Sequence, residues 1–409
     1  MKPTLLKGIR LVDLSMGWAG PLAGRHFADM GAEVIKVESC QHVDWWRGWE
    51  ATQAWIDDHG AEKAVSFNTM NRHKKDVTLD LNTDRGRDLC KQLVAVSDAV
   101  IANYSGSVLG KLGLDYDDLR QVKPDIVMMS MPAFGSTGPW KNYRAYGSTI
   151  EQASGLPHIN GEADWPPTMQ HVALGDPIAG LNAAAALLIA LRHRHRTGEG
   201  QYLDLSQSEC LFPLGVHGIL SQAATGAPPA RMGNRSATQC PHGVYPCIDP
   251  DSWITIQVDS EDAWLSLKAL AAPLLDEFGD LEARIERRAA LDARLGQWTG
   301  QFEATGLMER LQGEGILAAA VLGAGEVAMS PHLAARQCFP LLSRAYVGEL
   351  PHPVSAWREG GVPYDIDAPS PTLGEHNTEI LTSLLGLSDE ELADLAEQQV
   401  IGTRPVLQE

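Results

Sequence analysis

Short apolar segments alternate with amphipathic segments along the first half of the chain. The apolar segments are rich in Val, Ile and Leu, which favour strands. We expect strands at 9–14, 33–37, 77–81, 98–102, 125–131 and 201–205, and helices at 21–30, 84–96, 116–122, 180–191 and 206–224. Strands that alternate with helices predict a parallel α/β sheet covered on both faces.

The pattern changes after the loop 225–241, which is rich in Gly, Pro and polar residues and is typical of a domain boundary. A second unit begins near His242, with a strand at 253–258 and helices at 261–271, 291–298 and 302–311. The composition changes again near Pro331. A last amphipathic helix is expected at 388–398.

Composition and charge argue against nucleic-acid-binding and membrane-spanning classes of protein. The chain has 409 residues and a formal net charge of -19, which argues against nucleic acid as a partner because phosphate binding needs a basic surface. The longest apolar run, 183–191, is too short for a membrane span. No secretory signal pattern opens the chain. The six scattered cysteines form no CxxC pair, which indicates free thiols and a cytoplasmic protein.

Asp176 is the first candidate catalytic residue. It lies in the run ALGDPIAG, just before the apolar stretch 180–191. Asp is a favoured helix N-cap and Pro is favoured at the first helical position, so Asp176 can simply begin a helix. A carboxylate at a helix N-terminus is also a possible nucleophile. The local sequence alone leaves both interpretations open.

The turn after the first strand contains Gly17, Gly20 and Gly24, in the spacing GxxGxxxG. Glu38 follows near the position of the ribose-binding acid in dinucleotide-binding folds. Because the GxGxxG pattern is absent, close strand–helix packing is as good an explanation as a bound cofactor. The basic run 72–75 is typical of a solvated face, with a phosphate-facing role as the alternative.

Other catalytic signatures are missing from the sequence. It contains no GxSxG, HExxH or Walker A motif, and we expect no metal centre. Trp45, Trp46 and Trp49 form an aromatic cluster that favours packing over a ligand cage.

Taken in order, these segments resemble the family III CoA-transferases, the group that includes formyl-CoA transferase and carnitine CoA-transferase. The resemblance spans nearly the whole chain, and no single segment carries it. It is carried by GIRLVDLSMGWAGPLAG, GAEVIKVE, NRHKKDVTLDLNT, ANYSGSVLGKLGLDYDDLR, PAFGSTGPW, YGSTIEQASGL, VALGDPIAGLNAAAALLIAL, RTGEGQYLDLS, PHGVYPC and PTLGEHNTEIL.

The resemblance implies a fold and a quaternary structure. It implies a large Rossmann-like domain made of residues 1–224 and 331–409, with an inserted smaller α/β domain at 225–330. It also implies an interlocked homodimer. The family's CoA-contacting positions correspond here to Gly17, Trp18, Ala19, Leu81, Asn82, Thr83, Asn103, Tyr104, Lys111 and Arg144. Lys75 is added as a possible phosphate partner.

The resemblance also implies the chemistry. Asp176 becomes the nucleophile that attacks an acyl-CoA thioester, and CoA moves to a carboxylic acid through an aspartyl mixed anhydride and an aspartyl-CoA thioester. The transfer is either between two acids or within one dicarboxylic acid. Developing oxyanions need preplaced N–H donors. Gly135 and Gly138 are candidates to bring backbone near the ligand, with a plain turn as the alternative.

Several positions depart from the pattern of the oxalate and formate enzyme. It has glutamine at Trp18, glutamate at Gly147 and arginine at Ser39, and its glycine-rich loop in the small domain is not evident here. Oxalate and formate are therefore not carried over, and Trp18 suggests a bulkier or less polar acyl group. The related α-methylacyl-CoA racemases need a histidine where this chain has Tyr146, which disfavours racemisation. A racemase or epimerase and a non-catalytic acyl-CoA-binding protein remain the alternatives, and an NAD oxidoreductase is a more distant one.

Overall fold

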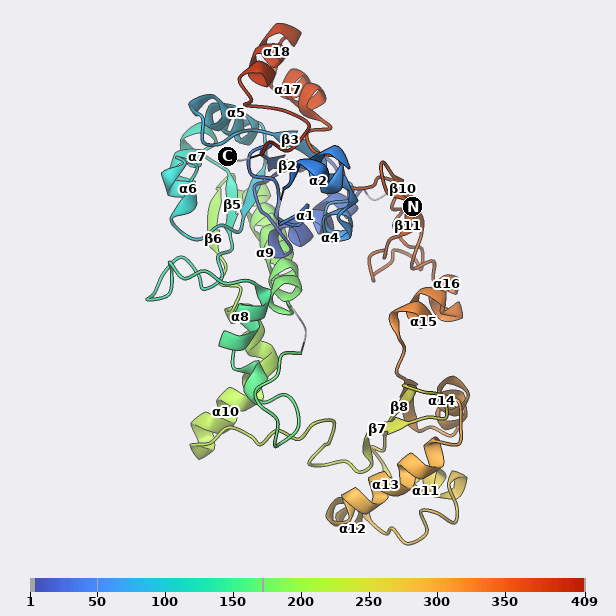
Figure 1. Cartoon of the computed structure of the whole chain (residues 1–409). Coiled ribbons are helices and arrows are strands. Elements are labelled where there is room, and N and C mark those ends of the chain that lie inside the picture. The colour runs from blue at the N-terminus through green and yellow to red at the C-terminus, as the bar shows by residue number, and fades with distance from the viewer. Residues whose placement is uncertain (1–3, 50, 171–172, 408–409) are drawn as a thin grey trace. The chain divides into compact units, whose positions relative to one another are not determined.

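The structure is a computed structural model and describes residues 4–49, 51–170 and 173–407 (Figure 1). The chain divides into two compact units. Unit 1 comprises Met1–Leu156, Met169–Ile219 and His332–Glu409, and unit 2 comprises Pro157–Thr168 and Leu220–Pro331.

A six-stranded sheet forms the centre of unit 1. Its order is β3-β2-β1-β4-β5-β6, and every neighbouring pair is parallel. The strands are β1 (Arg10–Asp13), β2 (Glu33–Glu38), β3 (Lys75–Thr78), β4 (Ala99–Ala102), β5 (Val127–Ser130) and β6 (Gln201–Asp204). This is the strand order of Rossmann-like folds, in which ligands bind beyond the carboxyl ends of the two central strands, here β1 and β4.

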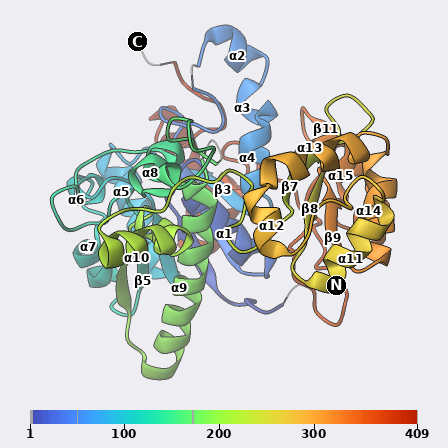
Figure 2. The same cartoon turned by 90° about the horizontal axis from the view of Figure 1, so that it is seen from below.

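One face of the sheet is covered by α1 (Ala19–Asp29) and the long helix α9 (Gly175–Thr197), which lie side by side (Figures 1 and 2). Their apolar side chains share one buried cluster with alternate residues of the strands. The cluster includes Leu11, Phe27, Ile101, Met129, Ala183 and Leu187.

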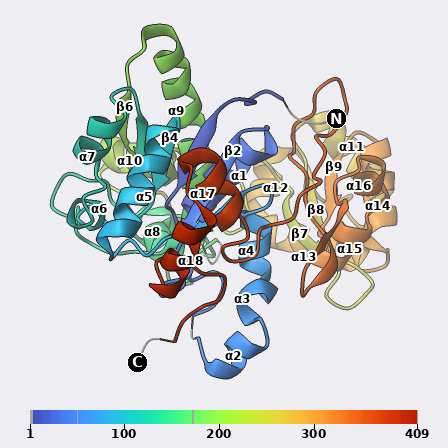
Figure 3. The same ribbon diagram turned by 90° about the horizontal axis from the view of Figure 1, so that it is seen from above.

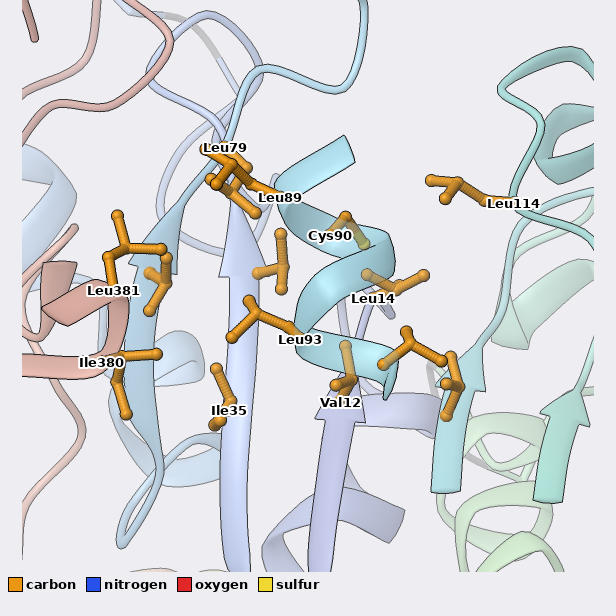
Figure 4. Packing of buried hydrophobic residues seen from close by; sticks show 14 of the residues in the cluster. Val12, Leu14, Ile35, Leu79, Leu89, Cys90, Leu93, Leu114, Ile380 and Leu381 are labelled. Atoms are coloured by element: carbon orange, nitrogen blue, oxygen red, sulfur yellow. The ribbon is translucent and has the colours of Figure 1, made fainter. Parts of the chain in front are cut away.

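The opposite face is covered by α5 (Asp84–Ala95), α7 (Tyr116–Val122), α17 (Asn377–Leu385) and α18 (Asp389–Glu397). Val12 and Ile35 point from the strands towards Leu89 and Leu93 of α5 (Figure 4). Figure 3 shows α17 beside α5. The side chains on the two faces alternate along each strand, as a sheet with two buried faces requires.

The end of the chain completes this second core. Ile380 and Leu381 of α17 pack against β3 and α5. Thr78 of β3 donates its backbone N–H to Asn377 Oδ1 at 2.8 Å and its hydroxyl to the carbonyl of Gly402 at 2.7 Å. Residues about 300 positions later are therefore part of the edge of the sheet.

The other described elements of unit 1 are short. They are α2 (Gln53–Asp57), α3 (Gly60–Lys63), α4 (Val65–Met70), α6 (Val108–Lys111), α8 (Gly147–Ala153), the 3₁₀ turn Glu209–Gly215 and the antiparallel pair β10 (Leu341–Arg344) and β11 (Gly348–Pro351). The helices α10 (Val216–Thr225) and α16 (Pro331–Ala335) cross the boundaries between the units.

Unit 2 contains an antiparallel sheet in the order β7-β8-β9. Helix α13 packs on β7 and α14 on β9 (Figure 2). The elements are the 3₁₀ turn Leu156–His158 at its edge, β7 (His242–Pro246), β8 (Trp253–Gln257), α11 (Glu261–Leu270), α12 (Leu281–Glu286), α13 (Arg288–Thr299), α14 (Ala304–Gly313), β9 (Leu317–Ala320) and α15 (Ala324–Met329).

The structure corrects three expected elements. The helix expected at 180–191 runs from Gly175 to Thr197, and it ends at Gly198 in the left-handed conformation after the basic last turn. The helix expected at 206–224 is wrong in its first half. There the chain forms a 3₁₀ turn around Pro213, because Pro has no N–H to continue an α-helix. Strand β3 begins two residues before the expected 77–81.

Truncation of Leu381 tests whether α17 is part of the core. Leu381→Ala removes buried methyl groups between α17 and the sheet. The free energy of unfolding, measured in urea, should therefore fall by about 3 kcal/mol. Leu265→Ala, at an exposed position of α11, is the control and should change stability by less than about 0.5 kcal/mol. Equal small losses for both variants would show that the C-terminal helix is dispensable to the core.

Candidate active site

Asn103 joins the two loops that diverge at the centre of the sheet. It follows β4, and its side chain accepts a hydrogen bond from the N–H of Met16 at 2.9 Å and donates one to the Met16 carbonyl at 2.7 Å. Met16 follows β1. Both backbone groups of Met16 are therefore held by one amide, which fixes the turn that leads into α1.

A cavity of about 380 Å³ opens beside this turn. We call it the nucleophile cavity because its lining includes Asp176, which the sequence analysis predicts as the nucleophile. Its volume is in the range of small-ligand sites. Its lining mixes aromatic and polar side chains: Met16, Trp45, Asn103, Tyr104, Ser105, Ala133, Tyr143, Arg144, Ala145, Tyr146, Thr149, Asp176 and Gln207.

Asp176 does not cap its own helix. The N-cap position of α9 is Leu174, and Asp176 lies in the first helical turn. Its carboxylate faces the backbone N–H groups of Ala19 and Gly147, which lower its pKa. The capping interpretation is therefore wrong, and the side chain projects to the nucleophile cavity.

The two donors are the first residues of two other helices, since α1 begins at Ala19 and α8 at Gly147. The starts of α1 and α9 thus approach the same carboxylate, and the partial positive charge at a helix N-terminus stabilises an anion there. Gly180 permits this approach, because a Cβ at that position would lie 2.7 Å from the Ala19 carbonyl oxygen.

Burial has the opposite effect on this carboxylate. Removal of the Asp176 carboxyl from water raises its pKa to about 6, and the nearby N–H groups of Ala19 and Gly147 offset only part of that rise. At neutral pH the group is an anion that is poorly solvated by water, which is the state a carboxylate nucleophile needs.

A second cavity of about 200 Å³ lies on the other side of Met16 and Tyr104, which line both. We call it the neighbouring cavity. Its wall is mainly apolar, with polar groups from the ends of β2 and β3. The lining residues are Met16, Val37, Glu38, Ser39, His42, Asp44, Leu79, Asp80, Leu81, Asn82, Tyr104, Val108 and Leu112.

Aromatic rings form one wall of the nucleophile cavity. Trp45 packs edge-on against Tyr146, with ring centroids 5.3 Å apart, and both line the cavity. Trp49 contacts both rings, and Trp46 contacts Trp45 and Trp18. The sequence pattern favours packing for this tryptophan cluster, and it gives no sign that Trp45 lines the cavity.

Five of the expected ligand residues line the two cavities. Asn103, Tyr104 and Arg144 line the nucleophile cavity, and Leu81 and Asn82 line the neighbouring one. The turn residues Gly17, Trp18 and Ala19 follow Met16 directly.

Other expected residues have different surroundings. Thr83 caps α5 by accepting the N–H of Gly86. Lys111 is exposed at the end of α6. Lys75 is not brought to the site. It is the first residue of β3, at the amino end of the strand, whereas the cavities lie at the carboxyl ends, and it pairs with Glu33 at 2.9 Å and Glu379 at 2.7 Å.

The basic run 72–75 is neither a solvated face nor a phosphate site. Arg72 and Lys74 are buried and pair with Asp29 and Asp13, each at 2.7 Å. The glycines of the 135–138 loop also lie outside the lining of the nucleophile cavity. That loop is held by Asp204, which accepts the N–H of Ser136.

In residues 4–49, 51–170 and 173–407, no group of three or more His, Cys, Asp or Glu side chains is arranged to hold a metal ion. Across those same ranges, no helix has both the length and the apolar character needed to cross a membrane. All six cysteines are free thiols.

Comparison with known proteins gives consistent matches. Residues 6–377 match the CoA-transferase family III. The chain is 33% identical to the succinyl-CoA–D-citramalate CoA-transferase of Chloroflexus aurantiacus, over 98% of each chain. It is 29% identical to the succinate–glutarate CoA-transferase of Agrobacterium fabrum, over 93% of this chain and 95% of the relative. A CAIB/BAIF family protein from Brucella suis has a similar structure, with a TM-score of 0.83, 31% identity and coverage of 94% of this chain and 100% of that one.

The pKa of Asp176 predicts how the stability of the protein depends on pH. Because folding raises this pKa from 3.8 to about 6, the folded state holds the proton more tightly, and the ionised side chain costs stability above pH 6. Asp176→Asn should therefore stabilise the protein at pH 7.5 by about 2 kcal/mol, measured by urea unfolding. The gain should shrink as the pH falls from about 6 to 4 and vanish below about pH 3, where the carboxyl is protonated in both the folded and the unfolded state.

Asp88→Asn, at an exposed position of α5, is the control and should show little change at either pH. An Asp176→Asn variant that is less stable at pH 7.5 than the unmodified protein would contradict the cost of the buried charge.

Proposed function

The chain belongs to the CoA-transferase family III and is a CoA-transferase, and we propose that Asp176 is its nucleophile and that dicarboxylic acids are its substrates. One observation carries the proposal: a desolvated carboxylate that faces two backbone N–H groups lies in a cavity at the carboxyl ends of the central strands. The acids in the names of the two relatives, citramalate, glutarate and succinate, are all dicarboxylic.

The reaction proceeds through covalent intermediates on Asp176. One carboxylate oxygen attacks the thioester carbonyl of the acyl-CoA, the carbon–sulfur bond breaks, and CoA leaves as a thiolate. The thiolate then attacks the aspartyl carbonyl of the mixed anhydride and releases the donor acid as a carboxylate. The resulting aspartyl-CoA thioester retains the energy of the starting thioester, and the acceptor acid reverses the two steps.

The N–H groups of Ala19 and Gly147 supply the electrostatic stabilisation. They face the carboxylate of Asp176 in the resting enzyme. When the aspartyl carbonyl is attacked, the negative charge of the tetrahedral intermediate develops on its oxygen, close to these N–H groups. The donors are already in place, so little reorganisation is needed, and each such donor contributes about a hundredfold or more in rate.

CoA is expected to span both cavities past Met16 and Tyr104. The thioester end lies beside Asp176, and the apolar neighbouring cavity suits the flat adenine ring. Ser39, Asn82 and His42 provide polar groups there. Arg144 and Lys111 are exposed cations without an ion pair to another described residue, and we assign them to the phosphates.

We further propose a cytoplasmic homodimer, in which unit 2 is the inserted small domain. The outer side of α9 exposes Leu181, Leu188 and Ile189, next to a groove of about 360 Å³ with a mainly apolar lining. Exposed apolar surface of this kind supports contact with a second copy. The free thiols are typical of a reducing compartment.

The decisive test is capture of the covalent intermediate. After incubation with succinyl-CoA, peptide mass spectrometry should show an adduct on Asp176. Asp176→Ala should abolish the adduct and lower turnover by at least about 10⁴-fold, because no second nucleophile replaces the carboxylate. Binding of CoA should persist.

An unmodified Asp176 during turnover would contradict the mechanism. Deuterium incorporation at the α-carbon without exchange of acyl groups would instead establish a racemase. Tight CoA binding with no exchange across a panel of acids would establish a binding protein.

Arg144 tests where the phosphates of CoA bind. Arg144→Gln should raise the KM for acyl-CoA about tenfold and leave kcat nearly unchanged, since a charge-assisted contact to phosphate binds ground state and transition state alike. Arg120→Gln, on the exposed side of α7, is the matched control. An effect on succinyl-CoA that is absent with butyryl-CoA would assign Arg144 to the distal carboxylate instead.

A further inference from the structure

Asp44 is completely buried between the turn that follows β1 and the segment that follows β2. Its Oδ1 accepts the backbone N–H of Gly17 and that of Trp46, each at 2.9 Å. Its Oδ2 pairs with Nζ of Lys36 at 2.9 Å. A single carboxylate oxygen therefore joins two backbone segments that are far apart in the sequence.

Lys36 of β2 holds the other end of the same turn. Its Nζ donates a hydrogen bond to the carbonyl of Ser15 at 2.8 Å, in addition to its ion pair with Asp44. Between these two contacts, Asn103 holds both backbone groups of Met16. Three successive residues of the turn are thus held by side chains from β2, from the end of β4 and from the segment after β2.

The two segments that Asp44 joins form walls of the two cavities. Met16, which precedes Gly17, lines both cavities, and Trp45, which follows Asp44, lines the nucleophile cavity. The Trp45 ring lies directly on Gly17, since a Cβ built on Gly17 would be 2.1 Å from Cζ2 of that ring. A displacement of the turn would therefore move both walls together.

We propose that Asp44 is a positioning residue, which aligns the bound thioester with Asp176 by holding Met16 and Trp45 in place. The kinetic consequence of this inference rests on the proposed function, whereas the contacts of Asp44 do not. Asp44 lines the neighbouring cavity but not the nucleophile cavity, so it acts on the reaction through these two walls. Because a misplacement of about 1 Å can cost about a hundredfold in rate, loss of its contacts should slow the reaction of Asp176.

Two double variants test the role of the shared oxygen. Asp44→Asn/Lys36→Met removes both buried charges and keeps an amide oxygen that can accept the N–H groups of Gly17 and Trp46. Asp44→Ala/Lys36→Met removes both charges and that oxygen as well. Neither variant leaves one member of the pair as an uncompensated buried charge.

The rate of adduct formation on Asp176 in a single turnover should be about 100-fold lower in Asp44→Ala/Lys36→Met than in Asp44→Asn/Lys36→Met. The Kd for CoA should differ between them by less than about threefold, because the contacts to the rest of CoA remain. Equal rates in the two variants would overturn the proposal. A raised Kd with an equal rate would assign Asp44 to CoA binding and would also overturn it.

Asp29→Ala/Arg72→Met is the matched control, because it removes a different buried ion pair, of 2.7 Å, whose members line neither cavity. This variant should lose stability as Asp44→Ala/Lys36→Met does, but its rate of adduct formation should stay within about twofold of the unmodified enzyme. A comparable loss of rate in the control would show that the effect follows from general destabilisation, against the proposal.

Hydrogen exchange tests the contacts in the unmodified protein, where no variant has to fold. The N–H groups of Gly17 and Trp46, followed by mass spectrometry at residue resolution, should exchange at least about 100-fold more slowly than in an unstructured peptide. Exchange of either group at the peptide rate would overturn the proposal. If the unmodified enzyme forms no adduct with acyl-CoA, the proposed function fails, whereas hydrogen exchange still decides whether Asp44 holds the turn.

Discussion

The close approach of three helix starts organises the site of this protein. The first turn of α9 brings Asp176 to the first N–H groups of α1 and α8. Gly180 lets α9 lie against the Ala19 carbonyl, and Gly147 leaves room for the carboxylate itself. These two glycines thus allow the three helix starts to pack closely around the carboxylate of Asp176.

Buried charges hold the turn on which this contact depends. Lys74 donates to Asp13 at 2.7 Å and to the Pro21 carbonyl at 2.8 Å, and Lys36 donates to the Ser15 carbonyl at 2.8 Å. Burial opposes the charge on Lys36, and Asp44, Glu38 and Asp13 outweigh it and raise its pKa. Loss of one partner would leave a buried ion uncompensated, at a cost of about 3–5 kcal/mol. The turn between β1 and α1 is therefore rigid.

The topology of the sheet determines where the cavity lies, and the side chains that line the cavity determine which chemistry it can support. Parallel strands in this order leave a crevice where β1 and β4 diverge, and many unrelated activities use such a crevice. Glu38 has the position of a ribose-binding acid, yet it is paired with Arg47 at 2.9 Å. The broken glycine pattern and this ion pair distinguish the site from a dinucleotide site.

The sequence by itself determined the alternation of strands and helices, the six-strand order of elements along the first half, and Asp176 as the candidate for chemistry. Local patterns suffice there, because strand periodicity and helix boundaries depend on neighbouring residues. Only the tertiary structure decided that Lys75 and the 72–75 run serve ion pairs, that Trp45 lines the cavity, and that Gly147 and Ala19 face the carboxylate. These contacts join residues up to about 300 positions apart, and the distance between such residues is set by packing, which no local pattern records.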